Sequence, residues 1–384
     1  MRAARIVFLI LFFALSALPL ADKFLGFIPP VALVGVTTAP PAVEANLKTY
    51  WKGEFQPAFE ANFNEGLAIR GYFVRADNEL NLRAFSALGL DPHASQIIGK
   101  DNYVFERGYV DAFNRHDEVP SSEMEPKVER LALLQRYLES RGATLLVVIT
   151  PSKPLLYPEY LPKRYVFKER QNVPTNYEKF VPLLAKHGVH FVDGQALLTE
   201  LKPKVPFTLF SSSSTHWNDP AACEVSSVAI ATLGQQLGLE LPRLRCAPYL
   251  PDEKHQQRDI DILQVCNLWF EERLYQTVYR ARPRLIPRPS GPMPSLLMIG
   301  GSFSFYIAEY FRLYRMDHTI YRYYSTRHAR SRKTAINRET LDWEQEVFSK
   351  SAVVIEVNVE VVPKVGFGFL EDAERVIRER QAQN

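Results

Sequence analysis

A serine and a histidine, two residue types that together can perform acyl transfer, stand out in the second half of this sequence. Ser302 follows Gly300 and Gly301 directly after an apolar run, and an aromatic amphipathic segment comes next. The glycines permit a tight turn, and a helix that begins there would offer free N–H groups and the positive end of its dipole to an oxyanion. Ser302 is therefore either a nucleophile on a strand-to-helix turn or an ordinary helix N-cap. The stretch is not the G-x-S-x-G elbow, because Ser304 occupies the last glycine position.

A serine hydroxyl needs a base to become nucleophilic, and imidazole is the usual one. Of the eight histidines, His216 has the most suggestive setting, "FTLFSSSSTHWNDPAACEV": a strand-like run, a polar loop, then His-Trp ahead of a helical pattern. Alone, His216 would be interpreted as a loop histidine with satisfied hydrogen bonds. Together with a serine at a strand end, it forms a candidate catalytic pair.

The remaining sequence predicts the elements that would position this pair. Buried strands are expected at 143–150, 189–194, 294–301 and 351–362, and helices at 122–140, 176–188, 219–238 and after Ser302. Strands that alternate with helices predict an α/β domain with a mostly parallel sheet. Ligands of such sheets bind beyond the carboxyl ends of the strands, so the loops at 150–154, 192–194, 300–302 and 358–360 are expected on one edge. Near the start of this domain, turn residues 99–102 between two apolar runs predict a short hairpin.

The N-terminus predicts an exported chain. Arg2 and Arg5 precede the apolar stretch 6–21, which indicates an uncleaved signal-anchor with its basic end in the cytoplasm, or alternatively a cleaved signal peptide. Either way, the main domain would face the periplasm. We expect three segments: a signal-anchor or signal peptide with an apolar juxtamembrane run at 1–36, a helical arm or linker at 37–94, and the main domain at 95–384. The formal net charge of +3 does not indicate nucleic-acid binding, and export argues against it.

Three cysteines fit an oxidising compartment. Cys246 and Cys266 bracket a loop-like stretch and could form a disulfide, whereas Cys223 lies in a helical pattern and is interpreted as a small buried residue. No CxxC or Cys/His spacing suggests a metal site.

Several motifs, in order, resemble those of one family. They are "IIGKDNYVFERGYV", "LLVVITPSKPLLYPEYLP", "STHW", "RDIDILQVCNL", "IGGSFS" and "VVIEVNVE", and they follow an N-terminal membrane or export segment. The chain resembles the SGNH-hydrolase-like polysaccharide O-acetyltransferases of the AlgJ/AlgX type over roughly residues 95–365. The resemblance implies a flavodoxin-like sandwich of helices around a parallel sheet.

The resemblance also implies a reaction, in which acetyl passes through a serine ester to a polysaccharide hydroxyl outside the inner membrane. By position, Ser302 would be the nucleophile and His216 the base, and the turn at Gly300 and Gly301 would present backbone N–H groups to the oxyanion. No cofactor is expected. An integral-membrane acyl-transfer protein would be needed as the source of acetyl.

One departure concerns the orientation of the base. Where the family has an aspartate two residues before the histidine, this chain has Ser214, whose hydroxyl can fix a tautomer but carries no negative charge. Loss of such a carboxylate costs a factor of about 10⁴ in the serine proteases. Two further functions therefore stay open: a non-catalytic polysaccharide-binding or scaffold subunit, and a carbohydrate esterase.

An aromatic and basic stretch, "YRYYSTRHARSRK" at 321–333, predicts the acceptor surface. Aromatic rings stack on sugar faces, and guanidinium groups bind carboxylates or phosphates. The predicted substrate-binding residues are Tyr321, Arg322, Tyr323, Tyr324, Arg327 and Trp217. The stretch would form a groove for an anionic polysaccharide, or alternatively a solvated basic loop near lipid headgroups.

Overall fold

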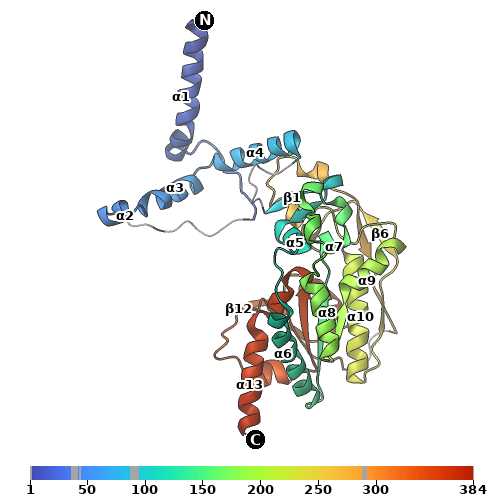
Figure 1. Cartoon of the computed structure of the whole chain (residues 1–384). Helices are drawn as coiled ribbons and strands as arrows, with labels where there is room; N and C mark the ends of the chain where they lie inside the picture. The colour runs from blue at the N-terminus through green and yellow to red at the C-terminus, as the bar shows by residue number, and fades with distance from the viewer. Residues whose placement is uncertain (1, 36–41, 43–44, 87–94, 288–291, 384) are drawn as a thin grey trace. The chain divides into compact units, whose positions relative to one another are not determined.

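The computed structural model describes residues 2–35, 42, 45–86, 95–287 and 292–383, which fall into two compact units (Figure 1). Unit 1 comprises residues 1–97 and 261–274, and unit 2 comprises residues 98–260 and 275–384. The expected boundary between residues 94 and 95 adjoins residues outside the described ranges. Residues 261–274, which were predicted to be part of the 95–384 domain, belong to unit 1.

Unit 1 is helical in its first part. Its helices are α1 (Arg2–Leu25), α2 (Leu47–Trp51), α3 (Phe55–Glu65) and α4 (Arg70–Phe85), with a short turn η6 (Glu271–Leu274) in its second part. Residues 5–25 of α1 have a mean hydropathy of 2.0 and are long and apolar enough to cross a membrane, by length and composition only.

Unit 2 is built around a seven-stranded sheet in the order β12-β11-β10-β9-β13-β3-β4. The strands β9 (Leu296–Gly300), β13 (Ala352–Asn358), β3 (Thr144–Thr150) and β4 (Phe191–Asp193) are the four that the sequence predicted. They are mutually parallel, and β10 (His318–Arg322) runs parallel to β9. The predicted α/β class with a mostly parallel sheet is confirmed.

Helices cover both faces of this sheet. Alternate side chains of β3 point to opposite faces, as the twofold period of a strand requires. Leu146 and Val148 join the apolar cluster under α9 (Gly194–Leu201), α10 (Asp219–Leu237) and α12 (Ser304–Leu313). Leu145 and Val147 join the cluster under α6 (Ser121–Glu139), α8 (Asn176–Lys186) and α13 (Phe369–Gln383). All residues of β3, β9 and β13 are buried, which explains why these strands are mostly apolar.

The remaining elements lie between or beside these layers. They are β1 (Gln96–Ile98), η1 (Lys100–Asn102), β2 (Val104–Glu106), α5 (Arg107–Phe113), α7 (Lys153–Leu156), η2 (Pro158–Tyr160), η3 (Lys163–Tyr165), η4 (Lys168–Arg170), η5 (Lys202–Lys204), β5 (Arg243–Arg245), β6 (Tyr249–Asp252), α11 (Gln257–Gln264), β7 (Val278–Ala281), β8 (Arg284–Ile286), β11 (Thr326–Ala329), β12 (Arg332–Ala335), η7 (Glu344–Phe348) and η8 (Val359–Gly368). The predicted hairpin is the two-stranded sheet of β1 and β2.

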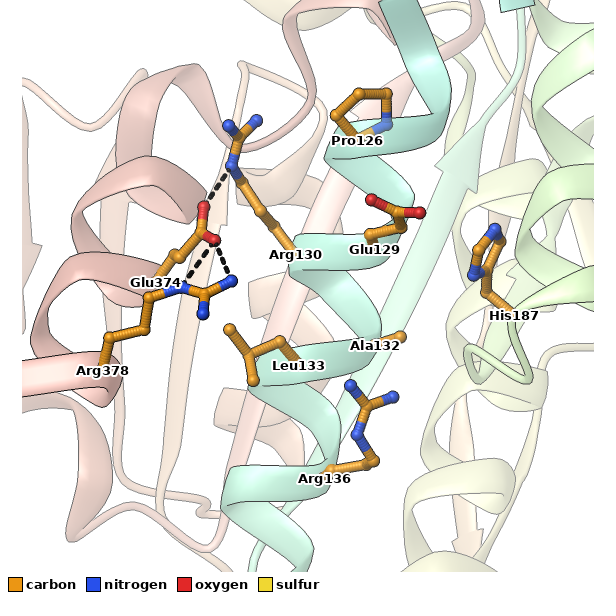
Figure 2. Close-up of a pocket in the computed structure, with 9 residues that line it drawn as sticks. All are labelled: Pro126, Glu129, Arg130, Ala132, Leu133, Arg136, His187, Glu374 and Arg378. Carbon is orange, nitrogen blue, oxygen red and sulfur yellow. Dashed lines mark hydrogen bonds and ion pairs between the residues drawn. The ribbon is translucent and has the colours of Figure 1, made fainter. Parts of the chain in front are cut away.

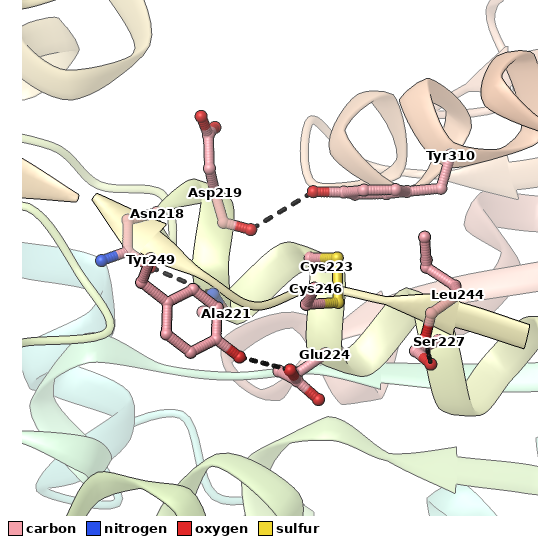
Figure 3. The surroundings of a disulfide bond; sticks show 10 residues. All are labelled: Asn218, Asp219, Ala221, Cys223, Glu224, Ser227, Leu244, Cys246, Tyr249 and Tyr310. Carbon is pink, nitrogen blue, oxygen red and sulfur yellow. Dashed lines mark hydrogen bonds between the residues drawn. A yellow bond between two sulfur atoms is a disulfide. The ribbon is translucent and has the colours of Figure 1, made fainter. Parts of the chain in front are cut away.

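The disulfide differs from the predicted one. Cys223 of α10 is bonded to Cys246, which follows β5, with their Cα atoms 5.7 Å apart (Figure 3). The prediction paired Cys246 with Cys266, and it is wrong. Cys266 lies in unit 1, where its buried thiol donates to the carbonyl of Ile262 at 3.3 Å. The helical setting of Cys223 suggested a plain core residue, because the sequence did not reveal that the segment after β5 lies against this face of α10.

Candidate active site

Ser302 lies at the carboxyl end of β9, on the turn that leads into α12. Its Oγ is 2.7 Å from Nε2 of His216, within hydrogen-bond distance. The helix begins at Ser304, its N-cap residue is Phe303, and no side chain caps it. The alternative of a helix N-cap therefore does not describe Ser302, whose hydroxyl faces an imidazole. Ser304 contributes to the turn instead, since its hydroxyl donates to the carbonyl of Gly301 at 2.5 Å.

His216 lies in the loop between Phe210 and α10. An isolated antiparallel bridge between Phe210 and Trp217 closes this loop, and Asn218 caps α10 by accepting from the amide of Ala221. The imidazole packs on aromatic rings from α12 and its N-cap: the centroid of Phe303 is 4.8 Å away, and that of Tyr306 is 5.2 Å away in a nearly parallel stack. These contacts limit the rotation of the imidazole and keep Nε2 directed at Ser302.

Ser214, for which the resemblance implied an aspartate, binds the backbone of this loop. Its Oγ accepts a hydrogen bond from the backbone N–H of His216 at 2.9 Å. Its carbonyl accepts from Nζ of Lys153 at 2.9 Å, and the same ammonium donates to the carbonyls of Ser212 and Val104. Lys153 is buried and comes from the "TPSKP" segment after β3, so this segment fixes the histidine loop. The only sequence signal for this role of Lys153 was its position shortly after an apolar run.

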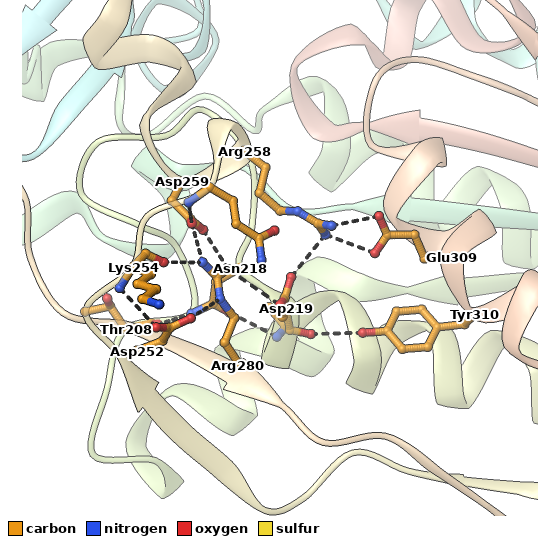
Figure 4. Close-up of polar contacts among 12 residues, drawn as sticks. Thr208, Asn218, Asp219, Asp252, Lys254, Arg258, Asp259, Arg280, Glu309 and Tyr310 are labelled. Atoms are coloured by element: carbon orange, nitrogen blue, oxygen red, sulfur yellow. Dashed lines mark hydrogen bonds and ion pairs between the residues drawn. The ribbon is translucent and has the colours of Figure 1, made fainter.

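Two carboxylates near the site in sequence have other partners. The Asp219 carboxylate accepts from Arg258 at 3.1 Å and lies 3.5 Å from Arg280 (Figure 4). Burial raises the pKa of Asp219, against the opposing effect of both guanidinium groups. Asp193 caps α9 through the amide of Ala196 and accepts from the hydroxyl of Tyr177.

Tyr306 connects the imidazole of His216 to this ionic cluster. Its ring stacks on His216, and the guanidinium of Arg258 lies 5.4 Å from the same ring centroid. Because Arg258 is held by Glu309 at 2.9 Å and by Asp219, it holds the Tyr306 ring in a fixed position. The cluster therefore supports His216 indirectly, through an aromatic ring.

Glu356 is a residue at this edge that sequence reasoning missed. It is only 1% exposed, and its Oε2 accepts from the backbone N–H of Gly301 while its Oε1 accepts from the hydroxyl of Thr150, both at 2.6 Å. Burial raises the pKa of Glu356 to about 7, against hydrogen bonds from Thr150 and Gly301 and the nearby His216, which lower it. The sequence did contain a signal for Glu356, because it is a single glutamate inside an otherwise apolar strand, "AVVIEVN".

The two glycines before Ser302 have different roles. A Cβ on Gly300 would lie 2.6 Å from Oε2 of Glu356 and 2.7 Å from its Cβ, so only glycine fits there. The N–H of Gly301 is bound to Glu356 and is not directed at an oxyanion. The Gly301 amide thus already has an acceptor within the protein, and the oxyanion role expected for this turn stays a prediction.

The predicted acceptor surface is only partly at the surface. The stretch 321–333 is not a loop: it contains the end of β10, the turn after it, β11 and the start of β12. The side chains of Trp217, Tyr321 and Tyr324 are fully buried, so these three offer no exposed surface to a glycan in this structure. The Tyr321 hydroxyl donates to Glu346 at 2.6 Å, which also pairs with Arg327 at 2.9 Å. The rings of Tyr321 and Tyr324 belong to the apolar cluster under α6, α8 and α13, and Trp217 belongs to the cluster on the other face of the sheet.

Tyr323 and Arg322 lie beside the nucleophile turn. The side chain of Tyr323 is 42% exposed, and its Cε1 would lie 3.3 Å from a Cβ on Gly301. The guanidinium of Arg322 lies 5.1 Å from the Tyr323 ring and 5.9 Å from the ring of Phe305. Arg322 is the last residue of β10, where it pairs with Gly300, and Tyr323 follows it.

A polar pocket between α6 and α13 does not contain any of these residues (Figure 2). Glu374 lies between Arg130 and Arg378 and accepts from both, at 2.7 Å and 2.8 Å. The charges in this pocket pair the two helices with each other, so we assign it a structural role.

The family model and the two relatives that match this chain are all described as acetyltransferases or O-acetylases. Residues 97–257 match the family model described as "SGNH hydrolase-like domain, acetyltransferase AlgX". This segment includes His216 and ends before Ser302. The chain is 26% identical over 201 residues to the probable alginate O-acetylase AlgJ of Pseudomonas syringae pv. tomato, covering 50% of this chain and 46% of the relative.

A second relative and a solved structure extend the comparison. The probable alginate O-acetylase AlgJ of Pseudomonas aeruginosa is 23% identical over 273 residues, covering 66% of this chain and 65% of the relative. The chain thus spans less than two thirds of either relative. The solved O-acetyltransferase domain of Pseudomonas putida AlgJ has a TM-score of 0.46 at 17% identity, covering 70% of this chain and 92% of that domain.

Proposed function

We propose that this chain, whose residues 97–257 match the SGNH hydrolase-like domain of the AlgX acetyltransferase family, transfers acetyl through a Ser302 ester to a polysaccharide hydroxyl. The observation that carries the proposal is the 2.7 Å contact between Ser302 Oγ and His216 Nε2 at the carboxyl edge of a parallel sheet. The relatives are named as probable alginate O-acetylases, which supports an anionic polysaccharide as acceptor.

In the first half-reaction, Nε2 of His216 accepts the proton of Ser302 while Oγ attacks the carbonyl carbon of an acetyl donor. The resulting oxyanion needs N–H donors, and the amides of Ser302 and Phe303 at the start of α12 are our candidates, since the Gly301 amide is bound to Glu356. The imidazolium then gives its proton to the leaving group. Acetyl remains on Ser302 as an ester.

In the second half-reaction, His216 accepts the proton of a sugar hydroxyl, whose oxygen attacks the ester carbonyl. Collapse of the second oxyanion transfers acetyl to the sugar, and Ser302 recovers its proton from His216. Tyr323 and Arg322 lie next to the turn and would contact the acceptor, the ring by stacking and the guanidinium by pairing with a carboxylate.

The proposed location follows from α1. Its apolar residues 5–25 would anchor the chain in the inner membrane, with unit 2 in the periplasm. The acetyl donor would come from an integral-membrane acyl-transfer protein. The disulfide between Cys223 and Cys246 supports an oxidising compartment.

A second candidate function is a polysaccharide-binding scaffold without turnover. The observation that favours it is Ser214, whose Oγ accepts from the backbone N–H of His216 and supplies no negative charge to the imidazole. A serine at this position cannot stabilise an imidazolium by charge, as a carboxylate there would, and this favours a site without turnover.

The test uses the full chain in detergent, incubated with p-nitrophenyl acetate, with release of p-nitrophenol and an acetyl group on Ser302 detected by mass spectrometry. We expect acetylation of the wild type, its loss in Ser302→Ala and a decrease of about 10³-fold or more in His216→Asn. Ser349→Ala, which removes an exposed hydroxyl just after η7, is the matched control and should behave as the wild type.

The acceptor distinguishes the remaining functions. Alginate oligosaccharides added to the acetylated chain should become acetylated, as a transferase requires. Release of free acetate alone would indicate an esterase. If the wild type forms no acetyl adduct and cannot be distinguished from Ser302→Ala, the scaffold function replaces the proposed one.

A further inference from the structure

The basic residues of the stretch 321–333 are divided between the two faces of the sheet. Because side chains alternate along a strand, Arg322 and Ile320 share one face of β10, and Ile320 belongs to the apolar cluster under α12. Arg327 is the cross-strand partner of Tyr321, which belongs to the cluster under α13 on the opposite face. The stretch therefore contributes to two surfaces, and the one with Arg327 faces away from α12.

A cavity of about 580 Å³ opens on the surface that faces away from α12. Its size falls within the roughly 300–1,000 Å³ of cavities that commonly hold ligands. Among the described residues that line it, four are cations and one, Asp317, is a carboxylate. The cations are Arg327 of β11, Arg330 of the turn after it, Arg332 of β12 and Lys350, which follows η7. The cavity thus has an excess of positive charge.

Three of these cations have no carboxylate partner within the described part of the chain. Arg327 pairs with Glu346 at 2.9 Å, whereas Arg330, Arg332 and Lys350 form no ion pair there. Like charges around one cavity repel each other, and an anion placed among them would replace this repulsion by attraction. The cavity is therefore suited to an anionic ligand.

The turn that presents Arg330 is an unusual place for an arginine. Ala329 pairs with Arg332, so Arg330 and Ser331 form a two-residue hairpin turn. The φ of Arg330 is 52°, in the left-handed region where such turns ordinarily have glycine, asparagine or aspartate. Because the residue lines the cavity, a ligand there would explain an arginine at a position that disfavours it.

Protection of the open sheet edge explains only part of this set. Charged residues on an edge strand such as β12 prevent edge-to-edge pairing. Arg327, however, lies on β11, which is paired on both sides with β10 and β12, and Lys350 lies outside the sheet. Binding of a ligand explains why all of these cations line the same cavity.

We propose that this cavity binds one segment of a carboxylate-bearing polysaccharide and holds the polymer while another segment reaches Ser302. The proposal rests on the proposed function for the identity of the polymer. Arg330, Arg332 and Lys350 pair with carboxylates of successive sugar units. Holding the polymer at a second place raises the effective concentration of its hydroxyls at the site of acetyl transfer.

The cavity is separate from the place of acetyl transfer. Cross-strand pairing brings Arg332 level with Thr319, and Thr319 level with Leu297 near the start of β9, whereas Ser302 follows the end of β9. With a rise of about 3.3 Å per residue, the two places are roughly 15 Å apart along the strands. A short oligosaccharide at Ser302 therefore leaves the cavity empty, whereas a long polymer reaches both.

Anionic lipid headgroups carry the same kind of charge, but the lining favours a polymer. Among the described residues that line the cavity, Ala329 is the only apolar one. A surface that lies on a bilayer inserts apolar and aromatic side chains, which this lining does not provide. A recess also admits a chain more readily than it admits a flat layer of headgroups.

The test is the variant Arg330→Gln/Arg332→Gln/Lys350→Gln, which removes the three unpaired charges and retains polar side chains. Binding of fluorescently labelled alginate polymer to the full chain in non-ionic detergent is measured by anisotropy. We expect the dissociation constant to rise about tenfold or more in the variant, and this difference to shrink as salt is added. Urea unfolding of the same preparations shows whether the variant is folded.

Acceptor kinetics distinguish this site from the place of acetyl transfer. In the variant we expect KM for alginate polymer to rise about tenfold, with kcat within about twofold of the wild type. KM for short alginate oligosaccharides and acetylation of Ser302 by p-nitrophenyl acetate should not change. A folded variant with the polymer affinity of the wild type overturns the cavity as a binding site and leaves the proposed function intact. Loss of polymer affinity in a chain that acetylates nothing keeps the site and overturns the proposed function.

The matched control removes the same charge from another surface. Arg243→Gln/Arg245→Gln/Arg284→Gln changes three exposed arginines of the two-stranded sheet of β5 and β8, and it should bind polymer as the wild type does. An equal loss of affinity in both variants would show that total charge, and not the cavity, attracts the polymer, which overturns the proposal.

The lipid alternative is tested with the full chain in phosphatidylcholine nanodiscs, mixed with phosphatidylglycerol vesicles that are then sedimented. We expect the cavity variant and the wild type to sediment with the vesicles to the same extent. If the variant loses vesicle binding and keeps its affinity for alginate polymer, the cavity binds lipid headgroups and the proposal is overturned.

Discussion

The serine–histidine contact depends on residues that hold the imidazole by packing and the turn by hydrogen bonds. His216 lies against Phe303 and Tyr306, two aromatic rings that follow the nucleophile along the chain. Ser302 and the aromatic contacts of His216 therefore come from one short segment. Orientation of the ring, one of the two tasks of a triad carboxylate, is thus provided by aromatic packing.

The two glycines allow a prediction with an internal control. Gly300→Ala places a Cβ 2.6 Å from Oε2 of Glu356, a contact that forces the carboxylate or the turn to move. Gly301→Ala meets Cε1 of Tyr323 at 3.3 Å, the edge of a partly exposed ring that can shift. We expect Gly300→Ala to lower the free energy of unfolding by about 1–3 kcal/mol and Ser302 acetylation at least about tenfold.

For Gly301→Ala we expect a loss of less than about 1 kcal/mol and activity within severalfold of the wild type. Urea unfolding and p-nitrophenyl acetate kinetics on the same preparations measure both quantities. Equal effects of the two substitutions would show that the close contact between Gly300 and Glu356 does not exist in solution.

At the scale of elements, the site is the meeting point of three adjacent strand ends and two connections. β9 leads into Ser302, β13 supplies Glu356 and β3 supplies Thr150. The loop before α10 supplies His216, so the position of α10 matters for the base. The disulfide and Tyr249, whose hydroxyl donates to Glu224, attach this helix to the segment around β5 and β6 (Figure 3).

The disulfide pairing gives a prediction for the stability of α10. Cys223 and Cys246 are 23 residues apart, a separation for which closure of the loop in the unfolded chain is expected to stabilise the fold by about 3 kcal/mol. The double variant Cys223→Ala/Cys246→Ala should lose about this amount in urea unfolding. Dithiothreitol should destabilise the wild type and leave the double variant unchanged. A non-reducing peptide map that links Cys246 to Cys266 would contradict this pairing.

The strands that carry the site could be predicted, whereas their neighbours could not. Runs such as "TLLVVIT" and "AVVIEVN" are mostly apolar because helices cover both faces of the sheet. Such runs can be recognised as buried strands from the sequence alone. The strands β10, β11 and β12 carry arginine and lysine toward the open edge of the sheet, where charged residues prevent edge-to-edge pairing. Their composition therefore resembled a basic loop.

The pair Ser302 and His216 could be predicted because glycine turns and histidine loops have local signatures. The contacts of Glu356 with the Gly301 amide, and the contacts of Lys153 with Ser214, join segments 55 and 61 residues apart. No local pattern specifies such a contact. The cysteine pairing failed for the same reason, since it depends on which segment packs on α10.

At the scale of the whole molecule, the apolar helix α1 and the seven-stranded sheet belong to different units. The residues of α1 from Ile6 to Phe13 are exposed to at least half of their area, which is costly in water and favourable in a bilayer. A transferase that receives acetyl from a membrane protein has a reason to stay at the membrane. An uncleaved α1 would provide this attachment.

Anchoring can be tested on the full chain expressed in a Gram-negative host. We expect the wild type to resist alkaline carbonate extraction and to have the intact mass of residues 1–384. Phe13→Asp/Leu15→Asp places two carboxylates near the centre of the apolar stretch, each at a cost of about 2.5–3.5 kcal/mol for insertion, and should remove the chain from the membrane fraction. Phe13→Leu/Leu15→Phe keeps the composition and should behave as the wild type. A mature mass that lacks roughly the first 20 residues would instead identify the segment as a cleaved signal peptide, and unit 2 would then reach its acetyl donor by diffusion.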